Sequence, residues 1–305
     1  MATIQTKGLT YRYGIGTPFE KTAVDHVDLE IESGSFVGII GHTGSGKSTL
    51  IQHLNGLLKP TEGSILLDGK DIWAEKAQMR QVRFRVGLVF QYPEYQLFEV
   101  DVLSDVCFGP KNQGLSKEEC EAQAKEALQL VGFPEKYYHQ SPFELSGGQK
   151  RRVAIAGILA MHPKVLVLDT PTAGLDPNER IRFRNLISEL AEERLVLLST
   201  HIVSDVEFIA NKIVLMKEGQ CCFEGTSDEV IASIDKKVYC FVAPREQVDH
   251  YMRNYLVVNV KTFGSNAELR ILSDHEPVKG ACVEEATLED AFLNYFGERA
   301  GESHA

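Results

Sequence analysis

The segment from Phe36 to Leu58 constrains the fold more than any other, because it joins an apolar run, a glycine-rich loop and a helical pattern. The run FVGII, residues 36–40, is continuously apolar, as in a strand buried on both faces of a sheet. GHTGSGKS follows over residues 41–48, and TLIQHLNGLL over residues 49–58 is typical of a helix. A buried strand that passes through a loop into a helix indicates α/β organisation. We therefore expect an α/β fold around this segment.

The loop Gly41–Ser48 has the residues that phosphate binding requires. Its glycines let backbone N–H groups turn inward on phosphates, Lys47 reaches the terminal phosphates, and Ser48 offers a hydroxyl to Mg²⁺ at a helix N-terminus. Such a pattern can match by chance, but here the preceding strand and the following helix are both present. The predicted contacts to nucleotide are Gly41, His42, Thr43, Gly44, Ser45, Gly46, Lys47, Ser48 and Thr49.

A second short pattern, LSGGQ at residues 145–149, precedes the helical sequence KRRVAIAGILA. A serine and two glycines at the start of a helix form an anion-binding tip when a phosphate is presented to them. Taken alone the pattern could equally be a plain helix cap. Beside a phosphate loop, the predicted contacts are Ser146, Gly147, Gly148 and Gln149.

Patterns along the rest of the chain predict two domains. Residues 91–146 read as a helical insert, with a capping box at Ser116 and Glu119 and a C-terminal cap at Gly132. Strand patterns resume at VLVL and RLVLLST, separated by a helix that opens at Asp176 and buries the face containing Phe183, Leu186, Ile187 and Leu190. Beyond about Ser233 the strands KVYCFVA, YLVVNVKTF and ELRIL and the helix TLEDAFLNYFG indicate a small α+β domain. The expected domains are residues 1–232 and 233–305.

Composition excludes several classes of protein. The chain is 43% hydrophobic and 25% charged, as in a soluble globular protein, and no run reaches the roughly 20 apolar residues of a spanning helix. A formal net charge of -11 disfavours a nucleic-acid groove or direct adsorption to an anionic membrane. The six cysteines lack a CxxC spacing, so reduced thiols are expected, not a disulfide frame or zinc site. We expect a cytosolic chain that reaches membranes only through a protein partner.

With both motifs in place, the chain resembles the ATP-binding cassette family, whose core is a P-loop NTPase domain with a helical subdomain. The resemblance implies that Tyr13 stacks on adenine, although a tyrosine there could also be a core residue. It implies that Gln91 senses Mg²⁺ and the partner, and that Asp169 holds Mg²⁺. Asp176 would couple the two sites of a dimer, and His201 would contact the γ-phosphate. ATP and Mg²⁺ are the implied cofactors.

The same resemblance implies partners. In this family two cassettes face head to tail, so that each ATP lies between one phosphate loop and the LSGGQ of the other subunit. Closure and hydrolysis then move attached membrane helices. We therefore expect a homodimer or heterodimer of cassettes, bound to a transmembrane subunit at the cytoplasmic face of the membrane as a peripheral protein.

The two halves of the chain resemble different transporters. GHTGSGKSTLIQHLNGLLKPTEG, VFQYPEYQLFE and DVCFGPKNQGLS resemble the ATPases of energy-coupling-factor importers of vitamins and transition-metal ions. ERIRFRNLIS, STHIVSDVEFIANKIVLMKEG and EEATLEDAFLNYFGE resemble cassettes of multidrug or antibiotic exporters, with the change near Asp169. The importer is favoured because the membrane partner of this family docks beside the Gln91 loop and the helical insert, and the sequences of these two segments are importer-like. An exporter, a soluble non-transport cassette and a regulatory ATP-binding module are the alternatives.

Thr170 departs from the family pattern. The family places a glutamate directly after the magnesium aspartate, where its carboxylate activates the attacking water, and general-base help contributes about 10²–10⁴-fold. A threonine hydroxyl cannot take up a proton near pH 7. We therefore expect ATP binding with slow hydrolysis at this chain's own loop, unless another carboxylate or His201 substitutes. The chain would then be a trapped homodimer or the degenerate half of a heterodimer.

Overall fold

The computed structural model describes residues 3–75 and 78–297 of the chain. Contacts divide the chain into two compact units, Met1–Cys222 and Phe223–Ala305. The sequence patterns placed a domain boundary at residue 232, whereas the contacts change within strand β10 (Gln220–Gly225). Within the described ranges, none of the helices is long and apolar enough to cross a bilayer.

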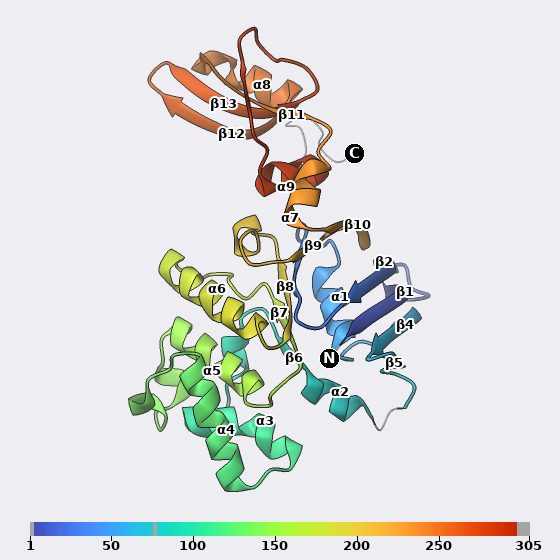
Figure 1. Cartoon of the computed structure of the whole chain (residues 1–305), viewed down its shortest axis with the longest axis vertical. Helices are drawn as coiled ribbons and strands as arrows, with labels where there is room; N and C mark the ends of the chain where they lie inside the picture. The colour runs from blue at the N-terminus through green and yellow to red at the C-terminus, as the bar shows by residue number, and fades with distance from the viewer. Residues whose placement is uncertain (1–2, 76–77, 298–305) are drawn as a thin grey trace. The chain divides into compact units, whose positions relative to one another are not determined.

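A mainly parallel sheet forms the centre of the first unit (Figure 1). Its strands, in spatial order, are β10 (Gln220–Gly225), β9 (Lys212–Lys217), β3 (Phe36–Ile40), β8 (Leu195–Thr200), β7 (Val165–Asp169) and β6 (Val86–Val89). The pairs β9–β3, β3–β8, β8–β7 and β7–β6 are parallel. Every residue of β3, β7 and β8 is buried, which explains why these strands read as continuous apolar runs.

A second, antiparallel sheet completes the core of this unit. Its order is β2 (Lys21–Ile31), β1 (Ile4–Tyr13), β4 (Glu62–Leu67) and β5 (Lys70–Asp71). Helix α1 (Lys47–Leu54) lies between the two sheets in Figure 1. Its residues Leu50 and Ile51 share one apolar cluster with Ile4 of β1 and Val167 of β7. This packing fixes the first turn of α1, and with it Lys47, at the edge of the central sheet.

The helix caps predicted for the first unit can be compared with its helices. The remaining helices are α2 (Met79–Arg85), α3 (Val102–Gln113), α4 (Lys117–Leu130), α5 (Gly147–Leu159) and α6 (Pro177–Ala191). The predicted capping box is confirmed, since Ser116 Oγ accepts from the Glu119 amide at 3.3 Å and the Glu119 carboxylate accepts from the Ser116 amide at 2.8 Å. Gly132 has a left-handed φ of 63°, as a C-terminal cap requires. On α6 the predicted inner face is confirmed: Phe183, Ile187 and Leu190 are buried, and Leu186 is half-buried.

The second unit is a four-stranded antiparallel sheet with helices. The strand order is β12 (Leu256–Phe263), β13 (Asn266–Ser273), β11 (Lys237–Pro244) and β14 (Cys282–Glu284). Its helices are α7 (Ser227–Ala232), α8 (Val248–Asn254) and α9 (Leu288–Phe296). Tyr239, Phe241, Tyr251, Leu269 and Ile271 belong to the apolar cluster of this unit. The three strands and the final helix predicted from sequence are therefore present, and Thr287 caps α9 as expected.

A buried ion pair attaches α9 to the sheet. Asp290 is completely buried, and its Oδ2 lies 2.7 Å from Nη2 of Arg270 on β13. Thr287 adds hydrogen bonds to the same oxygen from its amide and its hydroxyl, both at 2.8 Å. Burial would raise the pKa of Asp290, but the hydrogen bonds from Arg270 and Thr287 outweigh it and hold the pKa below its ordinary value.

Replacing Asp290 by alanine should weaken the second unit by about 3 kcal/mol, because the Arg270 guanidinium then loses its buried counter-charge. Hydrogen exchange of the β13 amides reports the opening free energy of this unit and is the measurement. Asp274→Ala, at an exposed position, is the control and should leave exchange unchanged. Equal exchange in both variants would contradict a stabilising role for the pair.

Candidate nucleotide-binding site

A cavity of about 310 Å³ opens where the strands of the central sheet end. It gathers the end of β1, the loop before α1, and the residues that follow β6, β7 and β8. Its lining residues are Tyr13, Lys21, Ala23, Thr43, Gly44, Gly46, Lys47, Ser48, Thr49, Gln91, Thr170 and His201. Ligands of α/β proteins bind at the carboxyl ends of parallel strands, and this cavity lies there.

Close backbone contacts require glycine at two positions of the loop from Gly41 to Ser48. A Cβ on Gly41 would overlap the carbonyl oxygen of Met216, and one on Gly46 would overlap that of Ala23. Gly46 also has a φ of 99°, which side-chain-bearing residues rarely adopt. The loop is therefore held close to β9 and β2, with its backbone turned toward the cavity.

Lys47 is folded back onto its own loop. Its Nζ donates to the carbonyl oxygens of Gly41 at 2.7 Å and His42 at 2.8 Å, and to Ser45 Oγ at 3.2 Å. Burial lowers the pKa of Lys47 to about 8, although the negative charge of Asp169 opposes the shift. A phosphate entering the loop would offer this ammonium a stronger, charged acceptor than the carbonyl groups that it now contacts.

Asp169 and its neighbours have the oxygen donors that Mg²⁺ prefers. Asp169 ends β7, is 4% exposed, and its Oδ1 accepts from Ser199 Oγ at 3.1 Å and Thr170 Oγ1 at 3.2 Å. The Ser48 hydroxyl and the Gln91 amide line the adjoining cavity. A carboxylate, a hydroxyl and an amide carbonyl are hard oxygen ligands, so this set fits a magnesium ion bound together with phosphate.

Thr170 occupies an unusual backbone position. Its φ is 45°, in the left-handed region that β-branched residues seldom adopt, and its amide donates to the Ser199 carbonyl at 2.8 Å. The side chain lines the cavity, but its hydroxyl hydrogen-bonds Asp169. The position therefore faces the phosphate loop without offering a carboxylate.

Aromatic and imidazole side chains complete the cavity. Tyr13 is 44% exposed, so it is not a core residue; its ring meets Tyr11 edge-on at 4.8 Å, and its hydroxyl lies 3.3 Å from Thr49 Oγ1. Gln91 and His201 are both exposed and line the same cavity. All three predicted residues therefore lie on the cavity wall, where a flat base and a phosphate chain could reach them.

The predicted LSGGQ contacts lie elsewhere. Ser146 caps α5: its Oγ accepts from the Gln149 amide at 3.3 Å, while its own amide donates to Gln149 Oε1 at 2.9 Å. Ser146 and Gly147 are exposed, and Gly148 and Gln149 are half-buried. None of these four residues lines the cavity that contains Lys47, nor does Asp176, whose carboxylate caps α6. The structure thus separates the two anion-binding patterns within one chain.

Comparison with known proteins identifies the family. The ABC transporter family model matches residues 24–173. The energy-coupling factor transporter ATP-binding protein EcfA2 of Clostridium tetani is 51% identical over 236 residues, covering 76% of this chain and 82% of that protein. The chain belongs to the ABC transporter family.

Solved structures agree with this family. This ABC protein is similar to cbiO1 from Clostridium perfringens, described as part of the ABC transporter complex cbiONQ, with a TM-score of 0.68 and 38% identity over 75% of this chain and 90% of that one. It is also similar to the dimeric post-hydrolysis state of the cassette MJ0796 bound to ADP and Pi, with a TM-score of 0.66 and 30% identity over 73% of this chain and 98% of that one. The P-loop NTPase fold of an ABC cassette is therefore established for the first unit.

A buried arginine joins three segments of this ABC cassette and was not singled out from sequence. Arg151 of α5 is 4% exposed and holds Glu94 in a two-point pair, with Nη2–Oε1 at 3.0 Å and Nε–Oε2 at 3.2 Å. Its Nη1 donates to the carbonyl oxygens of Pro171 and Ala173, both at 2.9 Å. The arginine therefore connects the loop after Gln91, the helix after LSGGQ and the loop after Asp169. Arg151 stands between Lys150 and Arg152, so no local pattern in the sequence signals its burial.

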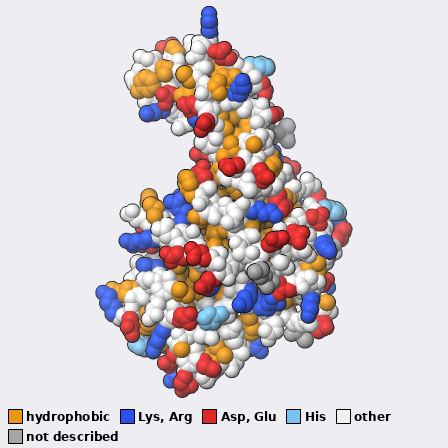
Figure 2. Space-filling view, viewed as in Figure 1, with side chains coloured by type: hydrophobic (Ala, Val, Ile, Leu, Met, Phe, Trp, Pro, Cys, Tyr) orange, Lys and Arg blue, Asp and Glu red, His pale blue; other side chains and the backbone are white. Residues whose placement is uncertain are grey.

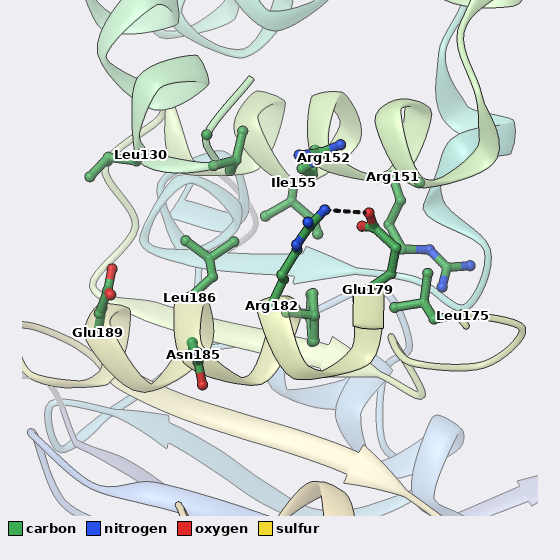
Figure 3. A pocket seen from close by; sticks show the side chains of 14 residues that line it. Leu130, Arg151, Arg152, Ile155, Leu175, Glu179, Arg182, Asn185, Leu186 and Glu189 are labelled. Carbon is green, nitrogen blue, oxygen red and sulfur yellow. Dashed lines mark hydrogen bonds and ion pairs between the residues drawn. The ribbon is translucent and has the colours of Figure 1, made fainter. Parts of the chain in front are cut away.

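A second hollow of about 310 Å³ lies between α5 and α6 (Figure 3). Leu130, Ile155 and Leu186 form apolar parts of its wall, and Arg182 Nη1 points to Glu179 Oε1 at 3.2 Å. A Cβ on Gly148 would come within 3.3 Å of Glu179 Oε2, so glycine lets α6 approach the LSGGQ turn closely. The hollow therefore adjoins the LSGGQ turn and not the phosphate loop.

Nucleotide affinity of this ABC cassette should weaken above about pH 8. Below that pH Lys47 is charged in both the free and the bound protein; above it the free lysine loses its proton, and binding must take one up. The dissociation constant for ATP in EDTA should therefore rise by up to about tenfold per pH unit. Calorimetry in buffers of different ionisation enthalpy measures the proton uptake directly. Lys47→Met, the control, should bind weakly without this pH dependence; constant affinity in the native chain would contradict the assignment.

Proposed function

We propose that this chain is the ATP-binding subunit of an energy-coupling-factor importer, coupling ATP binding and hydrolysis to uptake of a vitamin or a transition-metal ion. The observation that carries the proposal is that the phosphate loop, Gln91, Thr170 and His201 line one and the same cavity. The relatedness to an energy-coupling factor ATP-binding protein supports the importer class. We assign residues 1–232 to the cassette domain and residues 233–305 to a C-terminal domain.

Each part of the cavity has a proposed role toward ATP and Mg²⁺. Tyr13 stacks on the adenine, and the loop from Gly41 to Thr49 binds the phosphates through backbone N–H groups and Lys47. Ser48, Gln91 and Asp169 hold the magnesium ion, which neutralises charge on the phosphates. His201 donates a hydrogen bond to the γ-phosphate.

Separation of the two anion-binding patterns supports a dimer. Because Ser146, Gly147, Gly148 and Gln149 lie away from Lys47 of the same chain, we propose that they complete the site of a second cassette in a head-to-tail pair. Asp176 would lie at that interface and couple the two sites. A transmembrane subunit completes the assembly and holds this chain at the cytoplasmic face of the membrane as a peripheral protein.

The exporter and soluble alternatives receive less support. The alignment with EcfA2 spans 236 residues and must therefore extend well beyond Asp169, where the sequence suggested a change to exporter-like character. On the face shown in Figure 2, acidic and basic side chains are interspersed, which does not favour nucleic acid as a partner of a soluble cassette.

Purification of the tagged chain from native membranes tests the class. An importer ATPase should bring down a transmembrane protein together with a second ATP-binding protein, and mass spectrometry identifies both. Lys47→Ala should leave this assembly intact, because Lys47 is 7% exposed inside the nucleotide cavity and offers little surface to a docked partner. Recovery of the chain without any transmembrane protein would count against a transporter.

Thr170 gives the proposed subunit a specific place in a heterodimer. The cavity retains the phosphate loop, and Asp169 remains beside it, so nucleotide binding is preserved. The residue after Asp169 has a hydroxyl that hydrogen-bonds that carboxylate, and a hydroxyl cannot take up a proton from water near pH 7. We propose that this chain lends its LSGGQ to a partner cassette that carries the missing base.

Thr170→Glu should raise the ATP turnover of the purified chain at least about tenfold, because a carboxylate would then face the attacking water. Thr170→Gln is the matched control: it has similar size without a base and should not raise the rate. Nucleotide binding, measured by fluorescence of a labelled ATP analogue, should be similar in all three proteins. An unchanged rate in the glutamate variant would show that another step limits hydrolysis.

A further inference from the structure

Two cysteines of the second unit are direct neighbours across a strand pair. Cys240 of β11 is the antiparallel register partner of Cys282 of β14. Residues in such positions lie on the same face of a sheet with their Cα atoms about 4.5–5.5 Å apart. A disulfide requires Cα atoms about 4.4–6.8 Å apart, a range that includes the usual spacing of such register partners.

We propose that Cys240 and Cys282 form a reversible disulfide, making the edge of this sheet a site of thiol oxidation. The oxidant is a low-molecular-weight disulfide such as oxidised glutathione. The Cys282 thiolate attacks that disulfide, forming a mixed disulfide and releasing one glutathione thiol. The Cys240 thiolate then attacks Cys282 Sγ, forming the protein disulfide and releasing the second glutathione thiol. Two protein thiols are oxidised and one glutathione disulfide is reduced, so atoms and electrons balance.

The exposure of the two cysteines indicates which of them reacts first with the oxidant. Cys282 is exposed and meets the oxidant, whereas Cys240 is half-buried. Burial raises the pKa of Cys240, and the nearby Arg270 only partly offsets the shift. A smaller fraction of this thiol is therefore ionised, and it reacts more slowly with a dissolved disulfide. Its fixed position opposite Cys282 makes the second attack intramolecular, which compensates for a low thiolate fraction.

The other cysteines are poorer candidates. Burial raises the pKa of Cys107 to about 11, and that of Cys120 is also raised by burial. Both thiols belong to helices of the first unit, where no strand register sets their separation. Cys221 and Cys222 are adjacent in sequence and cannot face each other across a ladder.

The disulfide would fasten a strand that is otherwise weakly held. β14 has three residues and only three register pairs with β11. It leads directly to α9, and Glu284 of β14 pairs with the Arg270 that anchors Asp290. Oxidation would therefore restrain the segment between the sheet edge and α9 and slow hydrogen exchange in β14.

The test incubates the full-length protein with oxidised glutathione, alkylates the remaining thiols, and maps peptides by mass spectrometry without reduction. The native chain should lose two of its six thiols and give a Cys240–Cys282 cross-linked peptide. Cys240→Ser should instead retain glutathione on Cys282, because no thiol resolves the mixed disulfide. Cys282→Ser, a change at an exposed position, should give no cross-link, and Cys222→Ser should leave it intact.

Two outcomes would overturn the proposal. One is a native chain that retains glutathione on Cys282 to the same extent as Cys240→Ser, which would show that Cys240 does not reach it. The other is a cross-link from Cys282 to a different cysteine. Hydrogen exchange of β14 in oxidised and reduced protein gives an independent reading, since slower exchange is expected only in the oxidised native chain.

Discussion

The hydrogen bonds of one guanidinium group hold the functional loops of this cassette together. Arg151 is buried, and four of its N–H bonds are used, two on the Glu94 carboxylate and two on the carbonyl oxygens of Pro171 and Ala173. Removing the partner of a buried charge typically lowers the free energy of unfolding by about 3–5 kcal/mol, whereas an exposed ion pair contributes about 0–1 kcal/mol. The same guanidinium therefore contacts the loop after Gln91 and the loop after Asp169. Arg151 thus lies between the helix that begins at the LSGGQ turn and two segments next to the nucleotide cavity.

The contacts of Lys47 stabilise the phosphate loop from within. A buried ammonium without acceptors would be unfavourable, and Lys47 instead uses two carbonyl oxygens and a hydroxyl of its own loop. These contacts hold the lysine within the loop, and burial lowers its pKa to about 8. A bound phosphate would offer Lys47 charged acceptors in exchange for these neutral ones.

Local signals in the sequence determined much of what could be predicted. The strand, loop and helix around Lys47, the capping box at Ser116 and the inner face of α6 are each encoded in one short continuous stretch of sequence, which fixes backbone hydrogen bonds and side-chain faces. The pairing of Arg151 with Glu94 joins residues 57 apart in sequence, and no local pattern encodes it. The register that places Cys240 opposite Cys282 is likewise set by the whole sheet. The left-handed φ of Thr170 is a third such case, because the pattern that follows Asp169 gives a residue type but not the turn that it adopts.

That turn also bears on what a carboxylate at residue 170 would do. The backbone there is fixed from outside the residue, since the Thr170 amide donates to Ser199 and its carbonyl accepts from the Ala173 amide at 3.2 Å. A β-branched side chain is less well suited to a left-handed φ than an unbranched one, so glutamate should fit this backbone with less strain than threonine. Losing the threonine hydroxyl would remove one of the two hydrogen bonds to Asp169 Oδ1 but leave the one from Ser199 at 3.1 Å. The backbone at residue 170 should therefore accept glutamate without a change of fold, so that a difference in hydrolysis between the two side chains would be one of chemistry.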